Sequence, residues 1–508
     1  MVGGLSIPDG NDSLAEYTAR VLAPWSPIIA SNRAPFEPGP NGQFRKGSGG
    51  LVTALVTVAE ATAAPWVACA RTPGERELAA AAASGAVEVP GRNGPLQIHY
   101  VNPEPKAYDG YYSVISNPLL WFIHHYLYDL THEPVIDREY WEAWQDGYVK
   151  VNEMVARRVA EVAKGLPRTP LVLTQDYQLY VAPSLIRQLL PHAALQQFIH
   201  IPWPTARYWM VLPQAMREPI MNGLLANDLI GFQTSLDVRN FLITVEETMG
   251  LRVDHRERAV LHEGRVTWVR PYPISVDVPA MERMAASAGV RREVQRMAVD
   301  RPEKLVVRVD RTDPSKNIVR GFLAYERMLQ QHPDLHRKVE FHAFLQPSRQ
   351  DIRAYRSYLR LIRRTAERIN AELGDERWHP IRLELGQSMR RAVALYKDFD
   401  VLLVNSMYDG MNLVAKEGAL VNQRRGILVL SENVGAHEEL GEWVLTVNPF
   451  DVDATAEAIY LGLTAPEESR RALSEAAAQI VRTNDIGRWL SLQIRDLRDL
   501  VSPTRPTR

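Results

Sequence analysis

Short runs of apolar and β-branched residues recur along the chain and alternate with stretches of helical character. Strands that are buried on both faces read as continuous apolar runs, so this alternation predicts parallel sheets covered by helices. The runs fall into two series, which predicts an α/β chain with two doubly wound domains. The first series comprises 27–31, 96–101, 171–175, 197–201 and 229–233, and the second comprises 304–309, 339–345, 400–405, 426–430 and 443–447.

A proline-rich stretch separates the two series. Residues 270–279 contain three prolines, which interrupt helices and strands. At 508 residues the chain also exceeds the length, roughly 250 to 300 residues, at which a single core stops growing. We therefore predict an N-terminal domain over 1–270 and a C-terminal domain over 271–483. The amphipathic pattern of 484–500 predicts a helix that, with the rest of 484–508, returns to the first domain.

Charge and composition exclude several classes of partner. The 59 basic and 60 acidic residues give a formal net charge of -1, so no overall field attracts nucleic acid or anionic lipid. Residues 1–23 lack the basic start and apolar middle of a signal peptide, and the single Cys69 fits a reducing compartment. We expect a cytoplasmic protein without a membrane span. The arginine-rich stretch 351–370 has leucines between its arginines, which favours a solvated helix face, and 502–508 is expected to be disordered.

One segment of the second series combines a buried strand with a helix start. After the run at 400–405, the residues that follow Gly410 are good helix formers. A helix that begins at the carboxyl edge of a sheet directs free amide groups at the place where ligands of open α/β sheets bind, and such amides favour a diphosphate. Carboxylates beside them can accept hydrogen bonds from ribose and sugar hydroxyls. The residues expected to bind a nucleotide sugar here are Asp409, Gly410, Met411, Asn412, Leu413 and Glu417.

Two cations follow the first strand of the second series. Arg311 and Lys316 come directly after the run at 304–309, again at a carboxyl edge. Arginine can bind a phosphate through two parallel hydrogen bonds and lysine supplies a compact charge, so both would stabilise a diphosphate as it leaves.

Each segment also has a simpler interpretation. The first would be an ordinary strand-to-helix turn with Lys416 and Glu417 on a solvated face. The second would be a surface turn in which Asp313 pairs with Lys316.

Both segments resemble the donor-site motifs of one enzyme family. Residues 310–316, Asp-Arg-Thr-Asp-Pro-Ser-Lys, and 409–417, Asp-Gly-Met-Asn-Leu-Val-Ala-Lys-Glu, are similar to those of the retaining trehalose-6-phosphate synthase family, glycosyltransferase family 20, in its actinobacterial form. The resemblance implies a GT-B fold, in which two Rossmann-like domains face each other across a cleft, the first binding the acceptor and the second the donor. Further motifs follow the order of the family, among them Ser31-Asn-Arg33, Gly49-Gly50, Asp176-Tyr177, His200-Ile-Pro-Trp-Pro204 and Pro347-Ser-Arg349.

The resemblance also assigns residues to substrates. It implies a pocket for glucose 6-phosphate in which arginines hold the phosphate, a tyrosine adds a hydrogen bond and an indole covers the pyranose. It implies that His200 lies near the reacting carbon and acts with Arg311, Lys316 and Asp409, although histidine at a strand end is also a common core residue. Gly50 joins the donor residues. The acceptor residues implied are Arg33, Tyr112, Trp121, Asp176 and Arg349.

The chain departs from the pattern of the family at several positions. Glutamines 175 and 178 stand where histidines are usual, Cys69 stands near a usual tryptophan, and Ser275 and Asn317 replace glycines. Residues 385–391 contain no aromatic side chain to stack on the base. The donor base, uridine, guanosine or adenosine, therefore stays open.

The activity implied is the retaining synthesis of α,α-trehalose 6-phosphate from UDP- or GDP-glucose and glucose 6-phosphate, without a cofactor or metal, by a homo-oligomer. Related alternatives are a validoxylamine-phosphate synthase, which joins cyclitols, and a glucosylglycerol-phosphate synthase. An alternative from another class is a catalytically silent protein that senses sugar phosphates. Such a protein would be expected to have lost Arg311, Lys316, Asp409 or Glu417, and all four are present.

Overall fold

The computed structural model describes residues 14–39, 43–47, 50–82, 85–91 and 94–501. The chain divides into two compact units. The first comprises Met1–Ile274 together with Gly487–Arg508, and the second comprises Ser275–Ile486. The predicted boundaries at 270 and 483 lie four and three residues before these divisions. The segment 502–508, which was expected to be disordered, lies outside the described residues.

The first unit is built on a sheet whose central strands are parallel. The strand order is β10-β11-β12-β9-β8-β7-β1-β4-β6-β5, with antiparallel pairs at both edges. Parallel central strands that are buried on both faces explain the continuous apolar runs in the sequence. The strands are β1 Trp25–Ser31, β4 Trp66–Cys69, β5 Val87–Val89, β6 Leu96–Val101, β7 Thr169–Gln175, β8 Ala194–Phe198, β9 Leu229–Phe232, β10 Val253–Asp254, β11 Ala259–His262 and β12 Arg265–Pro271, and a separate hairpin pairs β2 Phe36–Pro38 with β3 Phe44–Lys46.

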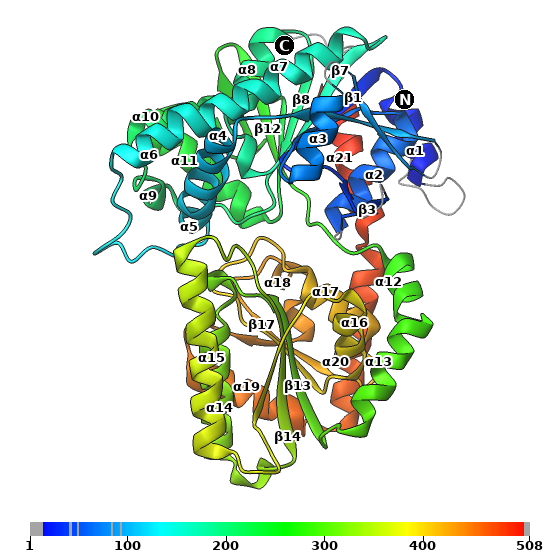
Figure 1. Ribbon diagram of the computed structural model, residues 1–508, viewed down its shortest axis with the longest axis vertical. Coiled ribbons are helices and arrows are strands. Elements are labelled where there is room, and N and C mark those ends of the chain that lie inside the picture. The colour runs from blue at the N-terminus through cyan, green and yellow to red at the C-terminus, as the bar shows by residue number, and fades with distance from the viewer. Residues whose placement is uncertain (1–13, 40–42, 48–49, 83–84, 92–93, 502–508) are drawn as a thin grey trace. The chain divides into compact units, whose positions relative to one another are not determined.

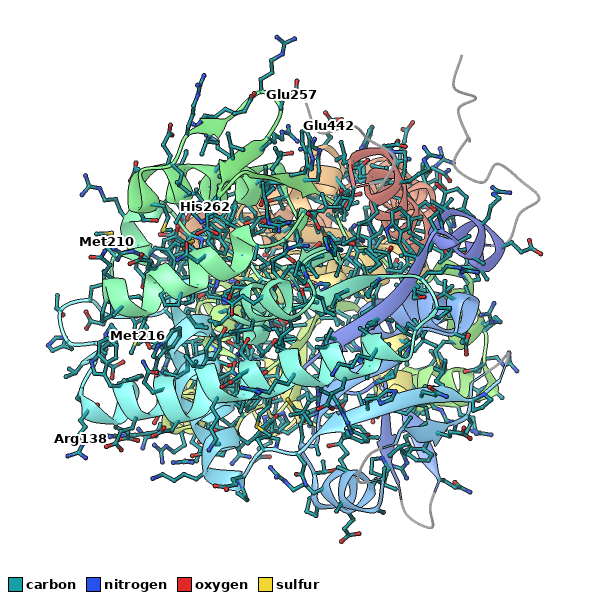
Figure 2. The ribbon with its side chains drawn as sticks, turned by 90° about the horizontal axis from the view of Figure 1, so that it is seen from above. Arg138, Met210, Met216, Glu257, His262 and Glu442 are labelled. Atoms are coloured by element: carbon teal, nitrogen blue, oxygen red, sulfur yellow. The ribbon has the colours of Figure 1, made fainter. Side chains whose placement is uncertain are left out.

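Helices pack on this sheet, and their apolar faces form the core. Met216, for example, is fully buried, whereas Met210 at a helix end is 56% exposed (Figure 2). The helices are α1 Leu14–Leu22, α2 Gly50–Thr62, α3 Pro73–Ala81, α4 Pro105–Asp109, α5 Trp121–His124, α6 Arg138–Glu142, α7 Lys150–Lys164, α8 Ala182–Leu189, α9 Ala206–Trp209, α10 Gln214–Leu225, α11 Ser235–Met249 and α21 Ile486–Val501. Shorter segments are the π-helices η2 Gly110–Leu120 and η3 Ala143–Val149 and the 3₁₀ turn η4 Tyr177–Leu179.

The helix predicted near the end of the chain is present as α21. Its apolar side chains Trp489, Leu490 and Ile494 are buried, and the Trp489 ring meets Phe198 of β8 edge-on at 5.2 Å between centroids. The last helix is therefore part of the core of the first unit, beside the end of β8.

The second unit is a six-stranded parallel sheet with the order β15-β14-β13-β16-β17-β18. Helices α14, α15 and α19 cover one face and share a core with the strands, and the other helices lie on the opposite side (Figure 1). The strands are β13 Lys304–Arg311, β14 Val339–Gln346, β15 Ile381–Leu385, β16 Val401–Val404, β17 Ile427–Ser431 and β18 Leu445–Val447. The helices are α12 Val278–Ala285, α13 Ala288–Val299, α14 Ile318–Gln331, α15 Arg353–Leu373, α16 Met389–Asp398, α17 Leu413–Val421, α18 His437–Leu440, α19 Val452–Thr464 and α20 Glu467–Thr483, with the 3₁₀ turns η5 Pro314–Lys316, η6 Pro333–Leu335 and η7 Gly441–Trp443.

The α/β class with two Rossmann-like units is confirmed, and the strand limits differ in places. The run expected at 197–201 is the strand β8, which ends at Phe198, so His200 lies beyond the strand. The strands β5, β10, β11, β12 and β15, which lie at or near the edges of their sheets, were not predicted, because strands there need no continuous apolar run. Within the described part of the chain, no helix is long and apolar enough to cross a membrane.

Candidate functional site

The two predicted cation and carboxylate motifs meet at one edge of the second sheet. Lys316 lies in η5 after β13, and Asp409 lies in the loop after β16, the neighbouring parallel strand. The Lys316 ammonium forms an ion pair with the Asp409 carboxylate, and their side chains are only 12% and 14% exposed. The alternative pairing of Lys316 with Asp313 is therefore wrong.

Hydrogen bonds hold Asp409 in place. Its Oδ2 accepts from Asn412 Nδ2 at 3.0 Å and from Ser406 Oγ at 3.3 Å. Its backbone pairs with the loop after β17, since its N–H donates to Asn433 O at 3.2 Å and its carbonyl accepts from Gly435 N at 3.0 Å. The carboxylate that meets Lys316 is thus fixed from both sides.

The helix after Gly410 begins later than expected. α17 starts at Leu413, and Asn412 before it has a left-handed φ of 62°. The side-chain amide of Asn412 donates a hydrogen bond to Asp409 and does not cap the helix. The first backbone amides of α17 are therefore left to other partners. The free amides therefore begin at Leu413, while Met411 and Asn412 belong to the turn.

The two residues of α17 that could have faced solvent differ in exposure: Lys416 is buried and Glu417 is partly buried. Lys416 is 1% exposed and forms a buried ion pair with Glu439. Glu417 shares a hydrogen bond with Tyr396 of α16, and burial raises the pKa of Glu417 to about 7. The interpretation that places both residues on a solvated face is therefore wrong for Lys416, whereas Glu417 keeps partial exposure. A carboxyl held half-protonated near neutral pH is an unusual surface feature and a common one at binding sites.

A buried arginine, Arg308, binds the loops at this edge of the second sheet, and it was not predicted from the sequence. Arg308 of β13 has no exposed surface and donates to Asp310 Oδ2 at 2.9 Å, to the Lys316 carbonyl at 2.8 Å and to Asn405 Oδ1 at 2.5 Å. It therefore links β13, the Lys316 loop and the end of β16. A charged residue between the valines of an apolar strand was the available signal. Arg311, the predicted phosphate ligand, is the last residue of β13.

Asn317, which replaces a usual glycine, also joins these loops. It has a left-handed φ of 57°, a conformation that asparagine tolerates better than most residues. Its side-chain amide donates to the carbonyls of Asn405 at 3.0 Å and Pro449 at 2.7 Å. The replacement keeps the turn and adds two hydrogen bonds across the sheet edge.

Arg349 belongs to the second unit, in the loop after β14. Its guanidinium donates to Tyr355 OH at 2.6 Å and reaches Asp313 Oδ2 at 3.5 Å. The other residues implied for the acceptor lie in the first unit.

In the first unit, the predicted acceptor residues lie after β1 and β7, in η2 and at the start of α5. Arg33 follows β1, and Tyr112 of η2 stacks on Tyr108 with ring centroids 5.8 Å apart. Trp121 is buried and stacks on His125 at 4.1 Å. Gly50 is the first residue of α2, and Gly49 lies outside the described residues.

Arg71 is a second cation beside Arg33 that was not predicted. Arg71 Nη1 lies 3.4 Å and Arg33 Nη2 lies 3.5 Å from the same oxygen, Glu37 Oε1. Two guanidinium groups that share one carboxylate leave a net positive charge, which favours an anion. The signal was the position of Arg71 directly after an apolar strand, at the same carboxyl edge as Arg33.

Asp176 and His200 come together at the ends of β7 and β8. Asp176 has a left-handed φ of 68°, and its Oδ1 accepts from the backbone N–H of His200 at 3.2 Å. The His200 ring lies between Gln175 Oε1, 3.2 Å from Nε2, and Gln233 Nε2, 3.3 Å from Nδ1. Burial lowers the pKa of His200 to about 3, so the imidazole is neutral at physiological pH.

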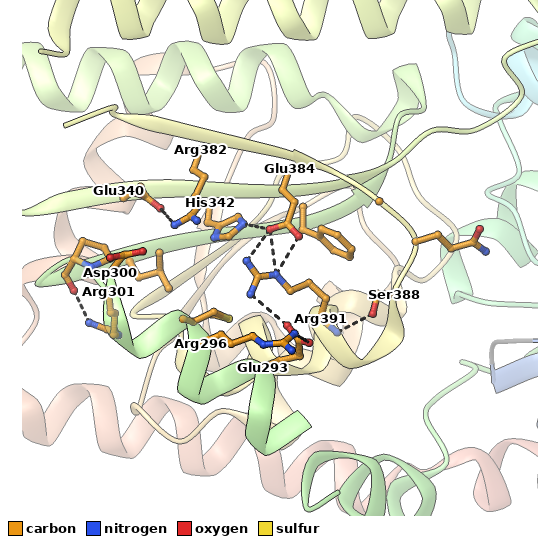
Figure 3. A pocket seen from close by; sticks show the side chains of 16 residues that line it. Glu293, Arg296, Asp300, Arg301, Glu340, His342, Arg382, Glu384, Ser388 and Arg391 are labelled. Atoms are coloured by element: carbon orange, nitrogen blue, oxygen red, sulfur yellow. Dashed lines mark hydrogen bonds and ion pairs between the residues drawn. The ribbon is translucent and has the colours of Figure 1, made fainter. Parts of the chain in front are cut away.

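A cavity of about 450 Å³ lies on the second unit, against β14 and β15 (Figure 3). Figure 3 shows Arg391 between Glu384 and Glu293. Its Nη2 lies 2.7 Å from Glu384 Oε2, and its Nη1 lies 3.8 Å from Glu293 Oε2. The cavity reaches residues 386–388, where the sequence has no aromatic side chain. Phe344 of β14 supplies one, because a Cβ added to Gly386 would lie 3.1 Å from its ring. Among the residues that the structure describes, no group of three or more acidic, histidine or cysteine side chains could hold a metal.

Comparison with known proteins identifies the family. The model of "Glycosyltransferase family 20" matches residues 27–499. A trehalose-6-phosphate synthase of Mycobacterium sp. (strain KMS) is 32% identical over 95% of this chain and 96% of its own length. A bifunctional trehalose-6-phosphate synthase/phosphatase of Thermoproteus tenax is also 32% identical, over 91% of this chain, and the chain spans 62% of its length.

Solved structures give the same result. A UDP-forming α,α-trehalose-phosphate synthase from Burkholderia vietnamiensis has a TM-score of 0.81 and 30% identity, covering 94% of this chain and 99% of its own. Trehalose-6-phosphate synthase from E. coli bound with UDP-2-fluoro glucose has a TM-score of 0.81 and 27% identity, covering 93% and 99%. Because the family match spans nearly all of it, the chain belongs to glycosyltransferase family 20 and is a glycosyltransferase homologous to trehalose-6-phosphate synthases.

Proposed function

We propose that this chain transfers glucose from a nucleotide-diphosphate glucose to glucose 6-phosphate and forms α,α-trehalose 6-phosphate with retention at the anomeric carbon. The observation that carries the proposal is the ion pair between Lys316 and Asp409, which brings both donor motifs to one edge of the second sheet. Arg311 ends the strand that leads to this edge. Phosphate binding by cations at this edge is what transfer from a diphosphate sugar requires.

In this proposal the second unit binds the donor. Arg311 and Lys316 stabilise the diphosphate, and the first free amides of α17, from Leu413, add hydrogen bonds to it. Asp409 binds hydroxyls of the glucosyl group, and ionised Glu417 binds those of the ribose. Gly410, Met411 and Asn412 shape the turn, and Gly50 of the first unit contributes its backbone.

The first unit binds the acceptor in this proposal. Arg33 and Tyr112 hold the phosphate of glucose 6-phosphate, and Trp121 and Asp176 contact the sugar. Arg349 of the second unit adds a guanidinium. Arg71 joins this group because it shares Glu37 with Arg33, and a phosphate dianion would replace that single carboxylate as the counter-charge of both arginines.

We propose that the acceptor hydroxyl attacks the anomeric carbon from the same face that the diphosphate leaves, which retains the configuration of that carbon. The departing diphosphate takes the proton of the acceptor hydroxyl. The environment of His200 supports this, because a ring with a pKa of about 3 is a poor proton carrier near neutral pH. Arg311 and Lys316 then supply the main electrostatic stabilisation as charge develops on the leaving group.

UDP-glucose is the donor to test first. A UDP-forming enzyme from Burkholderia and an E. coli enzyme bound to a UDP-sugar are among the solved structures that this chain resembles. Phe344 beside Gly386 provides an aromatic surface for a base near residues 385–391, but such a surface accepts a purine as well. GDP-glucose is the alternative.

The test is to incubate the protein with UDP-, GDP- or ADP-glucose and glucose 6-phosphate, and to follow release of the nucleoside diphosphate. Release that depends on both substrates, with trehalose 6-phosphate as the α,α-linked product in NMR, is the expected result. A cyclitol phosphate and glycerol phosphate serve as competing acceptors, and faster transfer to either would replace the proposed acceptor. No release with any nucleotide-glucose would overturn the proposal.

A further inference from the structure

His200 is held between two side-chain amides rather than beside a charged partner on its ring. Gln175, the last residue of β7, places Oε1 3.2 Å from Nε2 of the ring. Gln233, directly after β9, places Nε2 3.3 Å from Nδ1. Both glutamine residues are buried, with 5% and 1% exposure, so each amide has a fixed set of neighbours.

The orientation of the Gln233 amide is fixed by a third group. Its Oε1 accepts a hydrogen bond from the backbone N–H of Ile274 at 2.9 Å. A backbone N–H can only donate, so the oxygen of the amide must face Ile274 and the NH₂ group must face His200. A flipped amide would set a donor against a donor at Ile274.

This orientation determines which ring nitrogen carries the proton. The NH₂ group of Gln233 donates, so Nδ1 of His200 must present a lone pair. A neutral imidazole then carries its hydrogen on Nε2. That hydrogen points at Gln175 Oε1, which is an acceptor, so both contacts are satisfied by one tautomer.

An imidazolium would not fit the same contacts, because its Nδ1–H would face the NH₂ group of Gln233. The groups around the ring agree with a neutral form. The ring centroids of Phe198 and Trp489 lie 4.4 Å and 6.4 Å from that of His200. Asp176 accepts its hydrogen bond from the backbone N–H of His200 and not from the ring. Burial lowers the pKa of the ring to about 3.

We propose that Gln233 is a positioning residue that holds His200 in the neutral Nε2–H tautomer and ties it to Ile274, the last residue of the first unit before the chain passes into the second. The proposal rests on the proposed function for the role of His200 in transfer. Nε2–H is then the one N–H that the ring can offer to a substrate hydroxyl, and Gln175 Oε1 is the acceptor that such a hydroxyl would replace. His200 acts as a hydrogen-bond donor and not as an acid or base.

Substitution of Gln233 by glutamate tests this proposal. In Gln233→Glu one carboxylate oxygen can still accept from Ile274 N–H, but the other places an acceptor against Nδ1. The expected result is a proton on Nδ1 and a His200 pKa that rises into the range near neutrality. Gln233→Leu removes both contacts at similar volume and should release the tautomer without raising the pKa in this way.

The readout is ¹⁵N NMR of histidine-labelled full-length protein, with the His200 signals assigned by their loss in His200→Gln. Wild type should show the neutral Nε2–H pattern and no titration at neutral pH. A wild-type ring protonated on Nδ1, or one that titrates near its ordinary value of about 6.5, would overturn the proposal. So would an unchanged tautomer in a folded Gln233→Glu variant.

Kinetics provide a second, separate readout. Gln233→Glu should lower kcat by at least about tenfold and make it depend on pH near neutrality, because a single hydrogen-bond donor positioned at a reacting centre contributes a factor of this size or more. Gln188→Glu, the same change at an exposed position of α8, is the matched control and should change neither kcat nor the pH profile. Absence of transferase activity in wild type would sink the proposed function but leave the NMR result to decide the tautomer.

Discussion

Three basic side chains at the proposed donor edge of the second unit differ in the groups that they already bind. Arg308 is wholly buried and binds three groups of the protein, and Lys316 is paired with Asp409. Arg311 ends β13, partly exposed at the edge itself. Arg308 therefore supports the loops, and Arg311 and Lys316 are the two that we propose bind the diphosphate.

Arg311→Ala should lower kcat by at least about tenfold, because a single donor aimed at developing charge is worth several kcal/mol. Steady-state kinetics with saturating glucose 6-phosphate would measure this. Arg138→Ala, at a side chain that is 92% exposed in the first unit, is the control. Unchanged turnover in Arg311→Ala would refute its role in stabilising the leaving group.

We expect Glu417 to make the stability of the protein depend on pH and, if the proposed function holds, donor binding as well. Burial raises its folded pKa from 4.5 to about 7, so its contribution to stability is complete below 4.5 and is lost as pH rises through 7. The free energy of unfolding of wild type should therefore fall relative to Glu417→Gln between these values, by up to about 3 kcal/mol. Urea unfolding at several pH values measures the difference, with exposed Glu442→Gln as control.

Donor affinity should change in the opposite sense. If ionised Glu417 binds the ribose hydroxyls, KM for the donor falls as pH rises through about 7, and this dependence disappears in Glu417→Gln. Parallel pH profiles of the two proteins would show that the carboxylate has no part in binding.

At the scale of elements, the sequence predicts what depends on local pattern. The buried strands and α21 follow from apolar runs and amphipathic spacing, and the carboxyl-edge rule places Arg33, Arg311 and Asp409 at strand ends. The pairing of Lys316 with Asp409 and the role of Arg308 depend on which strands are neighbours, and a single sequence does not contain that order. Arg71 was missed because its shared carboxylate, Glu37, is 34 residues away.

Gly321 of helix α14 packs against the Arg308 side chain of strand β13. A Cβ at residue 321 would lie 2.6 Å from Arg308 Nη1 and 3.2 Å from Leu403 Cδ2. Gly321→Ala should therefore destabilise the protein by about 1–3 kcal/mol, as overpacking of cores does. It should also raise KM for the donor, because the displaced guanidinium holds the Lys316 carbonyl.

Gly321→Ala combined with Arg308→Met tests the cause. Flexible methionine can yield to the added methyl group, so the double variant should lose less stability than the sum of the single variants. Chemical unfolding of the four proteins gives the coupling, and Gly165→Ala, where the new Cβ would make only an ordinary 3.7 Å contact, is the control. Strict additivity would mean that the arginine does not oppose the new methyl group.

At the scale of the whole molecule, the two units differ in how the chain builds them. The second unit is one continuous segment, Ser275–Ile486, with its own core of strands and helices. The first needs α21 from the end of the chain, whose Trp489 packs on β8. The proposed donor residues other than Gly50 all lie in the continuous segment.

Residues 275–486 expressed alone should therefore fold and bind UDP without transferring glucose. Circular dichroism and cooperative unfolding would establish folding, and calorimetry would measure UDP binding. Because the Lys316–Asp409 pair, Arg311 and Glu417 are complete within this segment, its Kd should lie within about tenfold of that of the whole chain, a difference of about 1.4 kcal/mol. The same segment with Lys316→Ala should bind more weakly. A folded segment that fails to bind UDP, while the whole chain binds it, would show that the first unit supplies an essential part of the donor site.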